Sequence, residues 1–291
     1  MSNTNNIQNA PIGVIDSGIG GLTVLRELLL TCPNEYFIYI GDDVNSPYGT
    51  REAKEIQQLS LALAKHSKFE SIKALVIACN TITAAALDVI EANIEIPVIG
   101  VIDAGVSEAL AVSKNLKIGI LATTATVNSG VFDRALKQGN ANAEVTSVGA
   151  PKMHEYAENN LDLVMNNPTP EIKQCVRDYM QPFIDAGCDT ILMACTHFPP
   201  FENLVRDVVG SDVKIVSPSK NTAESLRTTL QDLNLSNSTP ANPTPAKQTS
   251  TNLSNQAINS ANITSANFNY EIISTAGNDE KYAKFSELLL Q

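Results

Sequence analysis

ALVIACNTITAAALDVI (residues 74–90) contains, in order, a run of apolar residues, an Ala-Cys pair, a short polar turn and the start of an amphipathic stretch. DTILMACTHFPPFENLV (residues 189–205) follows the same plan. A continuous apolar run that leads into a helix is typical of a parallel strand buried on both faces. The repeated plan predicts two halves of similar structure, each with a cysteine at the end of a strand.

Further apolar runs extend this pattern along the chain. They lie at residues 12–15, 37–40, 98–102, 118–121 and 213–216, and helix-like stretches such as 22–30, 51–67 and 84–92 lie between the runs. Alternation of this kind predicts an α/β fold, with two pseudo-symmetric open parallel-sheet αβα domains that face a central cleft. We expect residues 1–100 plus 213–291 to form the first domain and residues 101–212 the second.

One segment departs from this composition. Residues 234–267 are almost entirely Asn, Ser, Thr, Ala, Pro and Gln, with Lys247 as the only charge. So few apolar side chains do not offset the entropy of ordering the backbone. We therefore predict a flexible surface insertion, followed by a strand at 269–275 and a closing helix at 280–290.

The charge balance limits the classes of partner. The 291 residues include 20 Lys and Arg against 31 Asp and Glu, a formal net charge of −11. Broad nucleic-acid binding needs clustered basic residues, so the balance argues against it. The first ten residues, MSNTNNIQNA, lack the features of a signal peptide, and no apolar run approaches a membrane span. We expect a cytoplasmic protein with neither a nucleic-acid nor a membrane partner.

Two of the five cysteines differ from the rest. Cys79 and Cys195 end matching strands and precede polar residues, whereas Cys32, Cys175 and Cys188 have no such setting and are interpreted as structural. A helix N-terminus stabilises a thiolate, so we expect lowered pKa values for the matched pair. From the residues alone, the alternative that both are ordinary buried cysteines stays open.

Two thiols on opposite walls of one cleft suit the inversion of a stereocentre, because one can remove a proton while the other returns one to the opposite face. Polar residues follow the strands at the same edge: Asp16, Ser17, Asn80, Thr81, Thr196 and His197. A carboxylate and a hydroxyl suit an ammonium group, and donors at helix starts suit carboxylate oxygens. The glycines of residues 18–21 allow the backbone to approach a ligand closely.

Six motifs in this order resemble the glutamate racemases, within the cofactor-independent aspartate/glutamate racemase superfamily. They are PIGVIDSGIGGLTVLREL (11–28), YIGDDVNSPYGTR (39–51), CNT (79–81), PVIGVI (97–102), TTATV (123–127) and CTHFP (195–199). The resemblance covers about residues 11–225. It implies interconversion of L- and D-glutamate by two cysteines, with no cofactor and no metal, to supply D-glutamate for peptidoglycan.

The resemblance also implies roles for individual residues. Cys79 would take the α-proton from the D-isomer and Cys195 from the L-isomer, assisted by Asp16 and His197 respectively. The implied substrate contacts are Asp16, Ser17, Tyr48, Gly49, Asn80, Thr81, Thr123, Thr126, Thr196 and His197. Glu158 stands where the family commonly has an auxiliary carboxylate, although the sequence around it matches poorly.

Three other readings stay open at this stage. A racemase for aspartate or another amino acid would share the cysteine pair, and a non-catalytic amino-acid-binding regulatory protein would keep the cleft. Hydrolysis by a Cys–His pair would leave the second matched cysteine without a role. A small-molecule substrate is expected in the first of these readings too, and a homodimer is compatible with the sequence.

Overall fold

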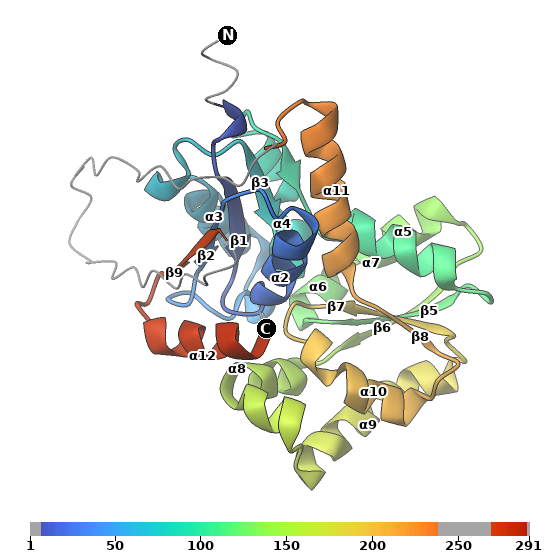
Figure 1. Cartoon of the computed structure of the whole chain (residues 1–291). Coiled ribbons are helices and arrows are strands. Elements are labelled where there is room, and N and C mark those ends of the chain that lie inside the picture. Colours follow the sequence, from blue (N-terminus) through green and yellow to red (C-terminus); the bar gives the residue numbers. More distant parts are fainter. Residues whose placement is uncertain (1–6, 238–268, 290–291) are drawn as a thin grey trace.

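Two separate parallel sheets form the framework of the protein (Figure 1). The computed structural model describes residues 7–237 and 269–289. Sheet A has the strand order β4-β3-β1-β2-β9. Its strands are β1 (Ile12–Asp16), β2 (Phe37–Gly41), β3 (Ala74–Ile77), β4 (Val98–Ile99) and β9 (Tyr270–Ser274).

Sheet B has the strand order β6-β5-β7-β8. Its strands are β5 (Lys117–Ala122), β6 (Glu144–Gly149), β7 (Thr190–Ala194) and β8 (Lys214–Val216). β1, β3 and β7 are buried along their whole length, which explains their continuous apolar runs. β6 was not among the predicted strands, because it is an edge strand of partly exposed residues with the sequence EVTSVG.

The two sheets repeat one strand order. Reading β4-β3-β1-β2 against β8-β7-β5-β6 pairs β3 with β7, the two strands that the sequence matched through their cysteines. β9 adds a fifth strand to the edge of sheet A. The predicted fold class, two similar α/β halves, is confirmed.

Helices cover both faces of each sheet. α2 (Leu22–Thr31) and α11 (Pro218–Asp232) pack together beside sheet A, and α3 (Ala53–Ala64) and α4 (Asn80–Glu91) share a core with its other face. Figure 1 shows α5 (Ile102–Val112) and α7 (Val131–Gly139) on one side of sheet B, with α9 (Pro170–Asp185) and α10 (Glu202–Val209) on the other. The remaining helices are α6 (Thr124–Ser129), α8 (Pro151–Asn166) and α12 (Asp279–Leu289), with short 3-10 turns η1 (Tyr48–Thr50), η2 (Ser67–Phe69) and η3 (Pro199–Phe201).

Two predicted boundaries are wrong. The apolar run at 98–102 is a strand only at Val98–Ile99, and α5 begins at Ile102. β8 pairs in parallel with β7, so it belongs to sheet B, whereas the predicted division at residue 213 assigned it to the first domain. Both errors arise where the chain crosses between the halves, because an apolar run does not reveal which sheet it joins.

The predicted insertion at 234–267 lies mainly outside the described residues. Its first residues are held by a buried ion pair between Lys73 and Glu35, which lie 2.5 Å apart. The Lys73 ammonium also donates to the Leu235 carbonyl at 2.8 Å, and the Asn237 amide donates to the Glu35 carboxylate at 2.9 Å. The packed chain therefore continues a few residues beyond the predicted start of the insertion.

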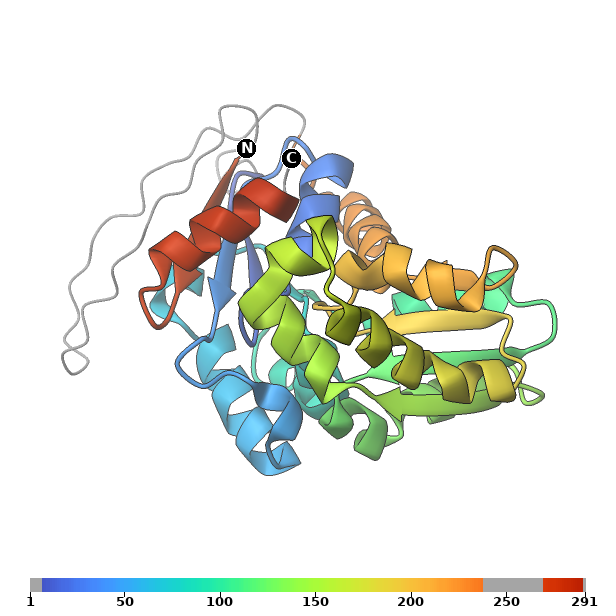
Figure 2. The same cartoon turned by 90° about the horizontal axis from the view of Figure 1, so that it is seen from below.

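The end of the chain returns to sheet A. β9 pairs with β2, and α12 then packs against α2 while lying close to α8, as Figure 2 also shows. Within residues 7–237 and 269–289, no helix is long and apolar enough to cross a membrane.

Candidate active site

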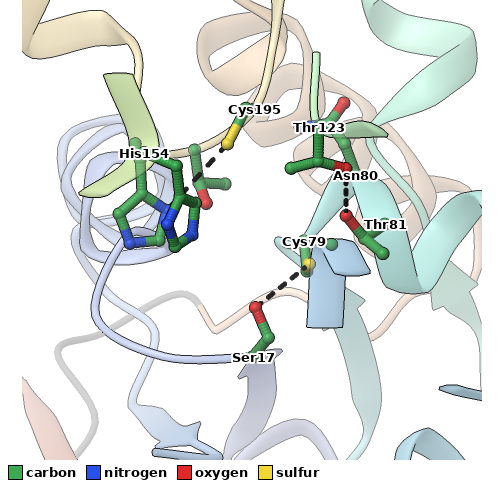
Figure 3. Close-up of a pocket in the computed structure, with 10 residues that line it drawn as sticks. Ser17, Cys79, Asn80, Thr81, Thr123, His154 and Cys195 are labelled. Carbon is green, nitrogen blue, oxygen red and sulfur yellow. Dashed lines mark hydrogen bonds between the residues drawn. The ribbon is translucent and has the colours of Figure 1, made fainter. Parts of the chain in front are cut away.

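A small pocket lies between the carboxyl ends of the strands of the two sheets, where parallel α/β folds place their ligands (Figure 3). The residues that line it are Ser17, Gly49, Cys79, Asn80, Thr81, Thr123, His154, Cys195, Thr196 and His197. Most of the predicted site residues are therefore brought together. Asp16, Tyr48 and Thr126 do not line the pocket, and the cavity volume is only about 10 Å³.

Cys79 lies at the N-terminus of α4, directly after β3. Its Sγ is 3.6 Å from Ser17 Oγ, and both point into the pocket in Figure 3. Burial, reinforced by the charge of Asp16, raises the pKa of the Cys79 thiol to about 12, although the Ile82 amide and the Ser17 hydroxyl oppose the shift. The predicted lowering of this pKa is wrong, because desolvation outweighs the start of the helix.

Cys195 follows β7, but no α-helix begins there. A turn and then η3 separate Cys195 from α10, which starts at Glu202. Pro199 and Pro200 have no backbone N–H to donate, so they do not continue a regular helical hydrogen-bond pattern from the turn. The expected helix N-terminus at this cysteine is therefore wrong, and the partner of the thiol is a side chain: His197 Nδ1 lies 4.0 Å from Cys195 Sγ.

The imidazole of His197 also contacts Glu158, whose Oε2 lies 2.7 Å from Nε2. Lys281 of α12 donates to the other oxygen of the same carboxylate at 2.6 Å. Burial lowers the pKa of His197, but the hydrogen bonds to Cys195 and Glu158 outweigh it and raise the pKa to about 10. Burial raises the pKa of Glu158, yet His197 and Lys281 together hold it at about 2. This half of the site therefore holds an imidazolium next to the sulfur of Cys195.

Asp16 is completely buried at the end of β1. It accepts hydrogen bonds from the Gly18 amide at 2.9 Å and from the Thr196 hydroxyl at 3.2 Å, so it connects the two halves. Burial raises its pKa to about 6, against the opposing effects of His197 and these two donors.

Glycine is required where this loop meets the second half. A Cβ at Gly20 would overlap the His197 ring and would lie 2.6 Å from Thr196 Oγ1. The predicted close approach of the glycine loop is therefore made to His197 and Thr196 of the protein itself.

Three threonines lie together on the other side of the pocket. Thr81 Oγ1 is 3.0 Å from Thr123 Oγ1 and 3.2 Å from Thr126 Oγ1. Gly49 packs against Thr123, where an added Cβ would lie 2.8 Å from the Thr123 Cβ. Tyr48 is fully buried and donates to Asp42 at 2.5 Å, so it supports the loop from behind.

One polar atom here has no partner among the described residues. Asn80 is almost fully buried in the pocket wall, and its side-chain Oδ1 accepts no hydrogen bond within that part of the chain. Buried polar groups are nearly always paired, so an exception at a pocket wall favours a ligand contact.

Sequence reasoning missed His154, to which it gave no role. It lies on α8 and lines the pocket, with its ring centroid 4.0 Å from that of His197. The spacing of His154 and Glu158 was an available signal, because residues four apart share one face of a helix.

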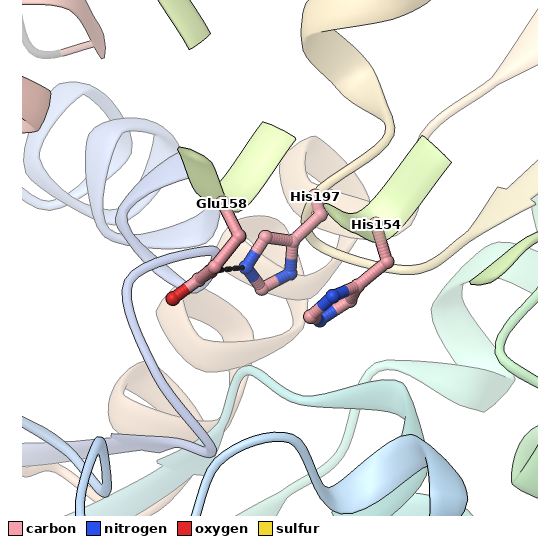
Figure 4. Close-up of side chains that lie close together, drawn as sticks. All are labelled: His154, Glu158 and His197. Carbon is pink, nitrogen blue, oxygen red and sulfur yellow. Dashed lines mark hydrogen bonds and ion pairs between the residues drawn. The ribbon is translucent and has the colours of Figure 1, made fainter. Parts of the chain in front are cut away.

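Three side chains form the one candidate metal-binding group found among the described residues (Figure 4). Ligand atoms of His154, Glu158 and His197 lie within 4.8 Å of one another. The Lys281 ammonium already occupies one oxygen of Glu158, and the raised pKa of His197 favours a proton on the ring. These contacts disfavour a cation, so the set does not fit a metal well.

Comparison with known proteins gives consistent matches. A family model described as Asp/Glu/Hydantoin racemase matches residues 12–226. A glutamate racemase of Levilactobacillus brevis is 40% identical over 233 residues, which cover 80% of this chain and 83% of the relative.

Solved structures agree with these matches. A glutamate racemase from Francisella tularensis in complex with D-glutamate has a TM-score of 0.80 at 31% identity, covering 98% of this chain and 94% of that one. An aspartate racemase homologue from Pyrococcus horikoshii shares the fold at 16% identity, with a TM-score of 0.53 and coverage of 76% and 99%.

Two parallel-sheet halves with a thiol from each in one pocket define an amino-acid racemase, an isomerase. The chain belongs to the Asp/Glu/hydantoin racemase family. The resemblance inferred from the six sequence motifs is confirmed.

Proposed function

We propose that this racemase interconverts L- and D-glutamate and supplies D-glutamate for peptidoglycan in the cytoplasm. The observation that carries the proposal is the pair Cys79 and Cys195, one from each half, on the wall of one pocket. The matching relative and the D-glutamate complex named above support glutamate as the substrate.

The reaction uses the two thiols as two bases. Cys79 takes the α-proton from the D-isomer, and Cys195 takes it from the L-isomer. In the free enzyme, the imidazolium of His197 lies 4.0 Å from Cys195 Sγ, whereas burial and the charge of Asp16 keep the proton on Cys79. With L-glutamate, Cys195 removes the α-proton and the protonated Cys79 delivers its proton to the opposite face.

The surrounding groups hold the substrate. Ser17 and the Asn80 side chain bind the ammonium group, with the negative charge of Asp16 behind the pocket wall, and Thr81, Thr196 and His197 bind the α-carboxylate. Gly49 and Thr123 on the pocket wall bind the side-chain carboxylate, while Tyr48 and Thr126 support them from behind. The unpaired amide oxygen of Asn80 is an acceptor, so it suits the ammonium group of the substrate. The cluster of threonine hydroxyls supports the carboxylate contacts. Fixed donors of this kind stabilise the carbanion that forms when the α-proton leaves.

A chiral assay tests the proposal directly. Purified protein without added cofactor should convert either enantiomer of glutamate to an equal mixture, and L-aspartate is the parallel substrate. Turnover of aspartate in preference to glutamate would assign the enzyme to the other substrate class. Binding of glutamate without turnover would establish a binding protein. Expression of the protein in a bacterial strain that requires D-glutamate tests the cellular role, because the strain should then grow without added D-glutamate.

Serine substitutions test the two bases. Cys79→Ser and Cys195→Ser should each lower kcat by at least about 10²-fold, because a hydroxyl is a far weaker acid than a thiol. The matched control is Cys188→Ser, which removes a buried thiol outside the pocket. Near-normal turnover in either pocket variant would contradict the mechanism.

Labelling in deuterated water gives a second measurement. Each isomer should gain deuterium mainly in the product of inverted configuration, because different thiols exchange with solvent on the two faces. Equal early label in recovered substrate and product would indicate a single exchanging base.

A further inference from the structure

His154 has no role in the mechanism described so far, yet it is half-buried in the pocket wall beside Cys195 (Figure 3). It comes from α8, one helical turn before Glu158. Figure 4 shows the rings of His154 and His197 next to each other, with Glu158 on the other side of His197. The ring centroids lie 4.0 Å apart, and the ring planes are inclined by 38°.

Hydrogen-bond contacts engage both nitrogens in the plane of the His197 ring, and the face of the ring has an aromatic neighbour. Nδ1 faces Cys195, and Nε2 faces Glu158, so both ring nitrogens are engaged. The face of the ring rests on His154. Burial and the neighbouring positive charge of His197 lower the pKa of His154 to about 3, although Glu158 opposes the shift, so His154 is a neutral ring at working pH.

A neutral aromatic ring against a cationic one is a favourable arrangement, because the electron-rich face attracts the positive charge. A second imidazolium at this place would instead repel His197. Packing against His154 also fixes the rotation of the His197 ring, on which both the 4.0 Å contact to Cys195 and the 2.7 Å contact to Glu158 depend.

We propose that His154 is a positioning residue for the Cys195 side of the reaction, whose neutral ring holds the His197 imidazolium in line between Cys195 and Glu158. The proposal rests on the two-base function proposed above. His154 acts through the face of its neutral ring and does not itself transfer a proton in the reaction. Its effect is confined to proton transfer at Cys195, because its aromatic contact is with His197, whereas Cys79 pairs with Ser17.

Two variants separate the ring face from the ring nitrogens. His154→Ala removes both and should lower kcat about tenfold, the effect expected for losing one aromatic contact. His154→Phe keeps a face and should recover kcat to within about threefold of the wild type, with little change in KM in either variant. The control is Glu155→Ala, an exposed neighbour on the same helix, which should change neither constant.

Isotope effects report which thiol is affected. If transfer at Cys195 becomes slower in His154→Ala, the primary isotope effect with α-deuterated L-glutamate should rise, and that with α-deuterated D-glutamate should fall toward one. Equal changes in both directions would overturn the one-sided role. Equal losses in the Ala and Phe variants would overturn the ring-face role and indicate use of the nitrogens.

A measurement without turnover keeps this proposal separate from the proposed function. The imidazole NMR signals of His197, identified by their absence in His197→Gln, should shift in His154→Ala and stay near the wild type in His154→Phe. Unchanged signals in His154→Ala would overturn the positioning role. Absence of racemisation in the wild type, with the NMR shifts as expected, would reject only the proposed function.

Discussion

Asp16 is a carboxylate placed where its charge is poorly solvated. It is fully buried at the end of β1, and burial raises its pKa from 3.8 to about 6. Because the folded-state pKa lies above the unfolded value, its contribution to stability is fully present below pH 3.8 and is lost as the pH rises through 6. At neutral pH the ionised form lowers the free energy of unfolding by up to about 3 kcal/mol.

The substitution Asp16→Asn should therefore stabilise the fold while lowering activity. We expect a higher free energy of unfolding than in the wild type at pH 8, and a difference that shrinks as the pH falls from 7 to 4. Urea unfolding across this range measures it. The exposed Asp103→Asn is the control and should show no such trend. A difference independent of pH would contradict the raised pKa.

At the residue scale, the sequence predicted which side chains gather but not their protonation. Cys79, Asn80 and Thr196 follow strand ends, and parallel strands bring such positions to one edge. The pKa of Cys79 depends on burial and on Asp16, neither of which a linear pattern shows. His154 was missed because its partner His197 lies 43 residues away, on a different element.

α12 joins the two halves at the level of whole elements. Tyr282 donates to Asp43 beside sheet A at 3.0 Å, while the neighbouring Lys281 reaches Glu158 on α8. The pKa of Glu158 is lowered to about 2, so its contribution to stability is present above pH 4.5 and is lost as the pH falls toward 2.

Lys281→Met should weaken this connection. We expect the free energy of unfolding at pH 7 to fall by about 1 kcal/mol and acid unfolding to begin at a higher pH, because Glu158 loses one cationic partner. Lys284→Met, on the exposed side of the same helix, is the matched control. Identical acid transitions in the two variants would show that the ion pair contributes nothing.

The polar segment after residue 237 can be replaced, we expect, without loss of activity. Lys73 and Glu35 form hydrogen bonds with the chain as far as Asn237, so a replacement of the segment should begin after that residue. Replacing residues 238–267 by a Gly/Ser linker should leave kcat/KM within a few-fold. Removing 234–267 as well should lower stability, since the buried Lys73–Glu35 pair would lose two partners. A large loss of activity in the shorter replacement would show that the segment packs on the body.

Elements were predictable where they are buried and continuous. The apolar runs predict β1, β3 and β7 correctly, because these strands are buried on both faces and therefore contain no alternating polar residues. β6 could have been inferred from the similarity of the two halves, because β6 occupies in sheet B the position that β2 occupies in sheet A. The sheet that β8 joins depends on pairing with β7, which is a property of the folded chain.

On the scale of the whole molecule, the halves are closed on each other. A cavity of about 10 Å³ holds about one water molecule, far less than an amino acid requires. The halves must therefore separate for glutamate to enter. The chain crosses between them at residues 100–101 and at Ser217, so we expect rotation about these crossings to open the pocket.

Small-angle scattering checks this movement. We expect a larger radius of gyration for the free protein than for the protein saturated with D-glutamate. A D-glutamate concentration of 100 times Kd should also raise the free energy of unfolding by about 2.7 kcal/mol. The variant Cys79→Ser is used for the measurement, because we expect it to racemise D-glutamate too slowly to change the ligand. An unchanged scattering curve together with tight binding would contradict a populated open state of the free protein and would limit opening to short-lived excursions.

The position of β9 has a consequence for how the protein is made. Sheet B is complete once Val216 has left the ribosome, whereas sheet A waits for residues 270–274, more than fifty residues later in synthesis. Until then β2 lacks the strand that pairs with it in the described structure, and an unpaired strand edge can pair with another chain. Sheet A contains both the first strand of the chain, β1, and the last, β9. Lys281 lies in α12 and is therefore synthesised after the strand that covers the edge of sheet A. In the order of synthesis, the contacts that link α12, Glu158 and His197 therefore become possible only when α12 has been made.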